Sequence, residues 1–428
     1  MTKRLFGLVL TVIAIFSLWG CENKNSKKPE EKTSRKTELE VYASQGEKEN
    51  LNLLVEEYEN MNPNVSININ LFPESEYTQQ MMRIKDQKIA ADCIFFPDAG
   101  EAEIWKNKKI LRDIHKWYAD TDEARYYKKW YKNMDADGEY YMIPYRMGKM
   151  CVYYNKTLFD SLNVSYPKQG WTWEDYKQTA GSLTGWSDNK RIYGTLGFAV
   201  PGSWWMLPAK IRGASDPFRE EDLKLYRDSA EWCRAFTYEL TENFPYFDWT
   251  GRDWGRYDRL FLEGRLGMYF GEDSEANVLN REIEEQQTSI TYDVAEMPLW
   301  DGNGNTHIYN TAVISMAEAT KHPEETYRFM KFCSGERGAK ILAGNSTIPA
   351  WQSSLVKETY LNSTKIPIHR ELFLRDEDKP PAETAVGVLH NAGVEAMENE
   401  VTLYMLGEQE LNYTFEEIEK KLEALQKE

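Results

Sequence analysis

Gln45, Glu47 and Asp98 are polar residues that stand directly after predicted strands. They belong to the segments 44–47 and 97–100, each of which follows a short apolar run. Amide and carboxylate groups at such positions can hydrogen-bond a small ligand, so both segments are candidates to face one. Neither segment contains GxGxxG or GxxxxGK[ST], so a nucleotide-phosphate cradle is not indicated.

Histidine and cysteine, which could supply metal ligands or nucleophiles, show no functional spacing. The five histidines are scattered along the chain: His115, His307, His322, His369 and His390. Four cysteines lie in apolar surroundings without a CxxC pair: Cys93, Cys151, Cys233 and Cys333. We expect buried free thiols, with a disulfide as the alternative that the sequence does not assign. The sequence therefore predicts no catalytic residue, no metal site and no cofactor.

The elements that would position the two polar segments alternate between strand and helix. Apolar residues predict a strand over 39–43, and a spacing of i, i+3, i+4, i+7 predicts a helix over 51–61. Alternation over 65–71 predicts a second strand, followed by a helix over 74–88 and a buried strand over 94–96. This order predicts an α/β fold with a parallel sheet, whose ligands usually lie beyond the carboxyl ends of the strands.

The middle of the chain predicts two strands and a capped helix. Residues 140–144 and 150–154 are expected to form strands joined through 145–148. Thr172 opens a segment of the form [ST]xx[DE], the capping box that starts a helix. At the C-terminus, an amphipathic helix over 415–425 is expected to pack against the rest of the protein.

Length and composition restrict the class of protein. The chain has 428 residues, a formal net charge of −17, 41% hydrophobic residues and 13% aromatic residues. These values predict a large core and two or three domains, and they exclude a chain that is disordered throughout. The acidic balance also argues against nucleic-acid binding, which requires clusters of Lys and Arg.

The N-terminus predicts export and lipid anchoring. A basic start and an uncharged stretch over 5–20 give residues 1–20 the layout of a signal peptide. That stretch would span about 24 Å as a helix, less than the ~30 Å of a membrane core. It ends Leu-Trp-Gly-Cys, which resembles the lipobox of bacterial lipoproteins, so Cys21 would receive the lipid and residues 21–37 would form a tether. An ordinary signal peptide is the alternative.

Several motifs occur in an order that resembles a known receptor family. Residues 140–176 carry Pro-Tyr, Val-Tyr-Tyr-Asn-Lys-x-Leu-Phe, Pro and Thr-Trp-Glu-Asp in succession. Three further pieces follow them: FLEGRLGM at 261–268, MPL at 297–299 and FMKFCSGERG at 329–338. This order resembles the family 1 extracellular solute-binding proteins, the maltose-binding-protein-like receptors of bacterial ABC importers, over nearly all of residues 38–360.

The resemblance implies a type II periplasmic-binding-protein fold, in which two lobes, each a mainly parallel sheet flanked by helices, enclose a ligand cleft. The implied lobes are discontinuous: 38–146 plus 300–348 for lobe one, and 147–299 plus 349–428 for lobe two. Three crossings would act as hinges: 145–149, 297–303 and 346–351. The family also implies a monomeric receptor without enzymatic activity, held at the outer face of the cell membrane, that closes on a carbohydrate and delivers it to the permease subunits of an ABC transporter.

The resemblance also implies further ligand-binding residues. Trp204 and Trp205 stand where the family tends to offer aromatic rings, which suit the apolar faces of sugars. Arg146 lies in the first crossing, Trp351 lies beside the third, and Glu272 stands where many relatives carry Gly-x-Trp. Core packing is the alternative for the aromatic residues. The complete predicted set is Gln45, Glu47, Phe96, Asp98, Arg146, Trp204, Trp205, Glu272 and Trp351.

Three other functions are kept as alternatives. A secreted carbohydrate-active enzyme would also be acidic and aromatic, although its two carboxylates cannot be identified from spacing in sequence. A receptor of the same fold could bind a non-sugar solute such as a glycerol phosphate. A lipoprotein chaperone or adhesin would bind proteins instead.

Overall fold

The computed structural model describes residues 36–131, 138–187, 189–196, 198, 204–239, 256–379, 381–382 and 387–427. The predicted signal peptide, Cys21 and the tether up to residue 35 lie outside the described residues.

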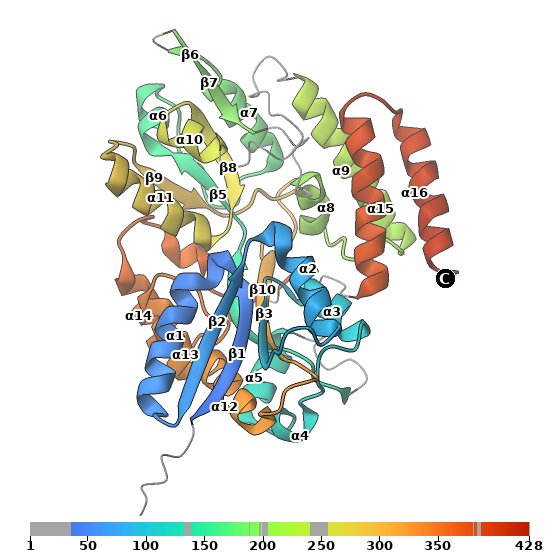
Figure 1. Cartoon of the computed structure of the whole chain (residues 1–428). Coiled ribbons are helices and arrows are strands. Elements are labelled where there is room, and N and C mark those ends of the chain that lie inside the picture. The colour runs from blue at the N-terminus through green and yellow to red at the C-terminus, as the bar shows by residue number, and fades with distance from the viewer. Residues whose placement is uncertain are drawn as a thin grey trace, which may run out of the picture. The chain divides into compact units, whose positions relative to one another are not determined.

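Two five-stranded sheets, each flanked by helices, organise the described residues (Figure 1). The first is formed by β1 (Thr37–Ser44), β2 (Val65–Phe72), β3 (Cys93–Phe96), β4 (Ile143–Lys149) and β10 (Tyr309–Met316), in the order β2-β1-β3-β10-β4. The second is formed by β5 (Cys151–Asn155), β6 (Gly185–Ser187), β7 (Lys190–Thr195), β8 (Leu266–Gly271) and β9 (Tyr292–Ala295), in the order β6-β7-β8-β5-β9.

Both sheets are mixed. β1 pairs in parallel with β2 and with β3, and β7 pairs in parallel with β8. The other neighbouring strands pair antiparallel. In the first sheet, β10 runs against β3 and β4. In the second, β5 runs against β8 and β9, and β6 runs against β7. The predicted α/β class is confirmed, while parallel pairing is less extensive than the mainly parallel sheets expected from the sequence.

The helices lie between the strands in the chain. The N-terminal ones are α1 (Lys48–Met61), α2 (Glu74–Lys85), α3 (Ala99–Asn107), α4 (His115–Tyr118) and α5 (Asp122–Trp130). Those of the middle are α6 (Lys156–Ser161), α7 (Trp173–Leu183), α8 (Leu207–Ile211), α9 (Glu220–Glu239), α10 (Arg256–Leu262) and α11 (Asp273–Gln286). The remainder are α12 (Pro323–Ser334), α13 (Glu336–Gly344), α14 (Ser354–Ser363), α15 (Val388–Met405) and α16 (Leu411–Leu425). Short 3-10 turns occur as η1 (Gln45–Glu47), η3 (Trp204–Met206) and η5 (Arg370–Phe373).

Several predicted elements are confirmed. The helices expected over 51–61 and 74–88 correspond to α1 and α2, and the C-terminal helix is α16, which packs against α15. The hydroxyl of Thr172 accepts a hydrogen bond from the Asp175 amide at 3.1 Å, while the Asp175 carboxylate accepts one from the Thr172 amide at 2.8 Å. This is the predicted capping box at the start of α7.

The loop predicted over 145–148 is wrong, because these residues belong to strand β4. Their backbone pairs on one side with β10. On the other side, the Met147 amide donates to the Ile348 carbonyl and the Ala350 amide donates to the Tyr145 carbonyl, each at 3.0 Å. Only Met150 separates β4 from β5, so the chain passes almost directly from the first sheet to the second.

Apolar cores cover both sheets. Leu39, Leu54 and Phe329 belong to the cluster between the first sheet, α1 and α12, whereas Tyr176 and Phe270 belong to the cluster between the second sheet and α7 to α9. The four cysteines from Cys93 onward are buried and unpaired, as expected. Within the described ranges, no helix has both the length and the apolar character that a membrane span requires.

Candidate functional site

An ion pair joins Glu47 to Arg146 at the carboxyl end of β1. Glu47 ends η1, the turn that directly follows β1, and Arg146 lies in β4. The Nη2 atom of Arg146 donates to Oε1 of Glu47 at 2.6 Å, and the two side chains are only 17% and 8% exposed. Two predicted residues that are far apart in sequence are thereby brought together in a largely buried position.

Acidic residues of the second sheet meet the same strand. Glu272 and Asp273 follow β8 at the start of α11. A Cβ atom added to Gly148 of β4 would lie 2.8 Å from Cδ of Glu272 and 3.2 Å from Oδ1 of Asp273. The first distance is shorter than real Cβ contacts and the second is unusually tight, so glycine at this position permits the close approach of the two carboxyl groups.

The groups that act on Glu272 come from the first sheet and from the loop after β3. Burial raises its pKa and the charge of Asp98 raises it further, whereas the charge of Arg146 and a hydrogen bond with Asn310 act in the opposite direction. Asn310 lies opposite Gly148 in the β4–β10 pairing, so both residues point to the same face of the sheet. Glu272 is therefore held among groups from the first sheet and the loop that follows β3.

Asp273 is fully buried beside the same guanidinium. Burial raises its pKa to about 7, the charge of Arg146 lowers it, and the charge of Glu272 raises it. One carboxylate oxygen accepts from the Ile348 amide at 3.2 Å. Burial also acts to lower the pKa of Arg146, but Glu47, Tyr145 and Asp273 together raise it well above its ordinary value.

The cluster contains an excess of acid. Its members are the carboxyl groups of Glu47, Glu272 and Asp273 around the guanidinium of Arg146, and we call it the junction cluster. Oε2 of Glu47, Nε of Arg146 and Oδ1 of Asp273 are buried and have no hydrogen-bond partner among the described residues. Such atoms retain the capacity to accept or donate hydrogen bonds.

Asp98 lies at the N-terminus of α3, where its Oδ1 accepts from the Glu101 amide at 2.7 Å. The neighbouring Gly100 carbonyl accepts from Nδ2 of Asn391 at 3.2 Å. Asn391 belongs to α15, which packs against α9 and α16. The first turn of α3 therefore contacts a helix that lies far along the chain.

The aromatic residues of the predicted set are dispersed. Phe96 is 1% exposed and packs edge-on against Tyr77, and Trp205 is 4% exposed within the core of the second sheet. Trp204 is half-buried, with its ring 5.3 Å from that of Phe270 in an edge-on arrangement.

Trp351 and Gln45 complete the predicted set. Trp351 packs on Tyr126, with ring centroids 4.2 Å apart. Gln45 is exposed in η1, and its side chain has no hydrogen-bond partner among the described residues.

Sequence reasoning missed four residues around these sites: Gly148, Asp273, Asn310 and Asn391. Asp273 could have been found from its position next to Glu272 and at a helix start. Gly148, Asn310 and Asn391 belong to these sites because they contact residues that are distant along the chain. A local sequence pattern does not contain such contacts.

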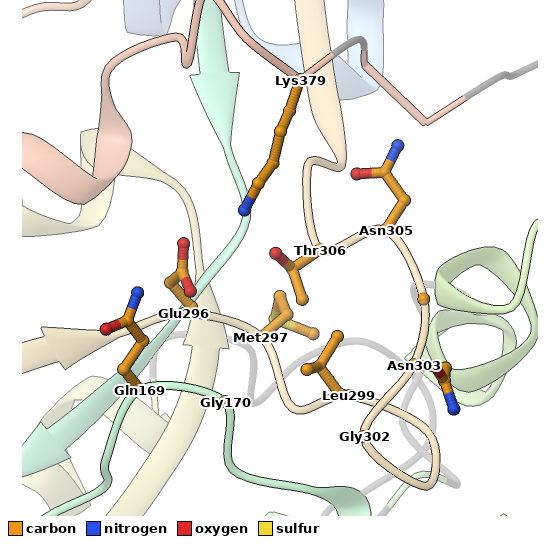
Figure 2. Close-up of a pocket in the computed structure, with 11 residues that line it drawn as sticks. Gln169, Gly170, Glu296, Met297, Leu299, Gly302, Asn303, Asn305, Thr306 and Lys379 are labelled. Atoms are coloured by element: carbon orange, nitrogen blue, oxygen red, sulfur yellow. The ribbon is translucent and has the colours of Figure 1, made fainter.

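A pocket of about 390 Å³, which none of the predicted residues lines, lies along the second predicted crossing (Figure 2). Its lining residues are Gln169, Gly170, Glu296, Met297, Leu299, Gly302, Asn303, Gly304, Asn305, Thr306 and Lys379. Among the residues that the structure describes, no group of three or more His, Cys, Asp or Glu side chains could hold a metal ion.

The protein has two mixed sheets, and the chain passes directly from one to the other. Polar side chains from both sheets meet at that junction. This arrangement defines a two-lobe α/β binding protein. Residues 42–340 match the family model of the bacterial extracellular solute-binding proteins, and the chain belongs to this family. The resemblance seen in the sequence motifs is thereby confirmed, and the family is one of binding proteins.

Similar proteins are distant in sequence. A putative binding protein of Brucella abortus is 20% identical over 322 residues, covering 72% of this chain and 74% of its own. A sugar transporter of Rhizobium etli in an open conformation superposes with a TM-score of 0.73 at 19% identity, over 91% of this chain and 99% of its own. An ABC substrate-binding protein of Listeria monocytogenes in complex with cycloalternan also has a TM-score of 0.73, at 20% identity, over 92% and 98% of the two chains. These structures share the fold of this chain.

Proposed function

We propose that this chain is an extracytoplasmic receptor that captures a neutral carbohydrate, with an oligosaccharide as the main candidate, and delivers it to the permease of an ABC importer. Family membership supports solute binding. The sugar is supported by the similar structures, since one is a sugar transporter and another holds cycloalternan.

The junction cluster is the observation that carries the proposal. Glu47, Arg146 and Glu272 come from the segments at and after β1, β4 and β8, and they offer charged hydrogen-bonding groups of both signs. Carboxylates accept hydrogen bonds from sugar hydroxyl groups, and a guanidinium donates to them. The half-buried ring of Trp204 would supply an apolar face for stacking.

The charge of the cluster also favours a neutral ligand. Three carboxyl groups surround one guanidinium, which is already paired with Glu47. A phosphate brought to this position would meet more negative than positive charge, and like charges in a poorly hydrated site repel strongly. This argues against the glycerol phosphate alternative.

We further propose that ligand capture involves movement of two lobes, 38–146 plus 300–348 and 147–299 plus 349–428. Support comes from the separate sheets and from the single residue, Met150, between β4 and β5. A ligand that contacts groups on both sides stabilises the arrangement in which those groups are close. The ligand would be released unchanged, so recovery of intact oligosaccharide after incubation separates this receptor from a hydrolase.

The location proposed is the outer face of the cell membrane, with the protein a monomer anchored through a lipid on Cys21. The family description supports export, and the lipobox-like sequence supports the anchor. Replacement of Cys21 by Ser should shift the protein from the membrane fraction to the soluble fraction. Retention in the membrane fraction would refute the anchor.

A thermal-shift screen of the purified chain against neutral mono- and oligosaccharides tests the proposal. A ligand present at 100 times its dissociation constant should stabilise the protein by about 2.7 kcal/mol. The proposal fails if a broad panel of neutral sugars gives no shift.

Two glycine-to-alanine variants test whether the junction cluster binds the sugar: one lies at the cluster, and the other is a control. Gly148→Ala should displace Glu272 and weaken sugar binding about tenfold, because the added Cβ would approach its carboxyl carbon to 2.8 Å. Gly181→Ala, in α7 with no atom within 4 Å of the added Cβ, should leave binding unchanged. Equal binding by the two variants would exclude the junction cluster from the site.

A further inference from the structure

The pocket along the second predicted crossing carries opposite charges on an otherwise polar wall. Lys379 and Glu296 both line it, and Figure 2 shows Lys379 extending toward the side of the pocket that holds Glu296 and Gln169. Within the described residues, neither Lys379 nor Glu296 forms an ion pair, although the charge of Lys379 also acts on the Asp376 carboxyl group. A ligand that carries both charges would complement the two groups.

The pocket also has an apolar floor. Met297 and Leu299 line it between the charged groups and the turn at 302–305. Gln169 and Thr306 also line it. We propose that this pocket binds an α-amino acid with an apolar side chain: Lys379 pairs with the carboxylate, Glu296 pairs with the ammonium, and the side chain packs on Met297 and Leu299.

Other small solutes fit these groups less well. A neutral sugar would bury part of the pocket without supplying a counter-charge to Lys379 or Glu296, and a phosphate would meet the Glu296 carboxylate. A zwitterion satisfies both charges at once, and charge-assisted hydrogen bonds are the stronger ones. The volume of about 390 Å³ is at the small end for ligand pockets and leaves room for an amino acid.

The walls of the pocket are anchored to different parts of the protein. Leu299 is tied to the start of α7: its amide donates to the Trp171 carbonyl at 2.8 Å, and its carbonyl accepts from the Trp173 amide at 3.1 Å. The segment that bears Lys379 is tied to α5, because the Arg375 guanidinium donates to the Tyr126 hydroxyl at 2.9 Å. An occupant would therefore link these two parts and raise the melting temperature of the protein.

Calorimetric titration of the full chain with L-leucine tests the proposal. Leucinamide lacks the carboxylate and 4-methylpentanoate lacks the ammonium, so each should bind at least about tenfold more weakly than leucine. Saturable leucine binding with this ranking supports the zwitterion site. No binding of leucine, or equal binding of all three compounds, overturns it.

Charge-neutralising variants locate the site. Lys379→Gln and Glu296→Gln should each weaken leucine binding about tenfold or more, whereas Lys340→Gln, an exposed lysine of α13, should have no effect. Unchanged leucine affinity in both pocket variants would overturn the assignment. Sugar binding should be equal in all three variants, so failure of this proposal is distinguishable from failure of the proposed function.

Discussion

Among single residues, Arg146 is the group on which the junction cluster depends. It pairs with Glu47 at 2.6 Å, and its charge lowers the raised pKa values of Glu272 and Asp273. Removal of one partner from a buried pair leaves the other charge uncompensated, which costs more than the pair contributes.

Arg146→Met should therefore lower the free energy of unfolding by about 3 kcal/mol, measured by urea denaturation. The double variant Arg146→Met with Glu47→Gln should recover most of this loss, because the Glu47 charge is then no longer left without its partner. Arg125→Met, which breaks an exposed pair with Asp122, should cost less than about 1 kcal/mol. A loss in the double variant as large as in the single one would contradict this role of Arg146.

The stability of the protein should also depend on pH through Asp273. Because burial raises its pKa in the folded state to about 7, above the ordinary value of 3.8, the folded state holds this proton more tightly than the unfolded state. The contribution of Asp273 is therefore greatest below about pH 4 and is lost as the pH rises through 7.

Asp273→Asn removes this titration. Between pH 5 and pH 8 the wild type should lose stability through the titration of Asp273, whereas the variant should not. The free energy of unfolding of the variant minus that of the wild type should therefore rise over this range, by a few kcal/mol at most, measured from urea midpoints. Parallel pH curves for the two proteins would show that Asp273 is ionised in the folded state throughout this range.

Part of the candidate site could be predicted from residue type. Glu47, Arg146 and Glu272 are charged residues at strand ends or crossings, and the structure brings them together. Phe96, at the end of a predicted strand, and Trp205, which the family resemblance implied, have side chains buried in cores. Neither a strand end nor a family motif indicates which face an aromatic ring occupies, because tertiary packing decides that.

For the helices and strands, local signals predicted most elements but not all of their boundaries. Residues 145–148 include a glycine and an arginine, a composition that is typical of a loop. They form a strand because β10 and residues 348–350 satisfy their backbone groups from both sides. Such pairing involves residues that are distant along the chain, which a local pattern does not contain.

The capping box of α7 is a local signal whose contribution can be measured. Thr172→Ala removes the acceptor for the Asp175 amide and should lower the free energy of unfolding by about 1 kcal/mol. Thr359→Ala, within α14, should change it by less than about 0.5 kcal/mol, because its hydroxyl bonds only the Leu355 carbonyl of its own helix. Urea denaturation of both variants checks this, and equal effects would show that the cap does not stabilise the protein.

For the molecule as a whole, the order of motifs carried more information than any single motif. It predicted the family, while the alternation of strands and helices predicted the α/β class; the family match and the fold confirm both. Strand direction was less predictable. β10 follows all strands of the second sheet in sequence and yet pairs with β3 of the first sheet, which no local pattern indicates. The pocket beside Lys379 was also not predicted, since its walls come from three separate segments.

The proposed function requires that the chain bind a neutral carbohydrate without converting it. Calorimetric titration with the oligosaccharide that gives the largest thermal shift, with glycerol 3-phosphate titrated in parallel, measures both ligands on the same protein. We expect saturable binding of one sugar per chain, recovery of the intact sugar and no binding of the phosphate. Saturable binding of glycerol 3-phosphate, with no heat from any neutral oligosaccharide, would overturn the proposed function.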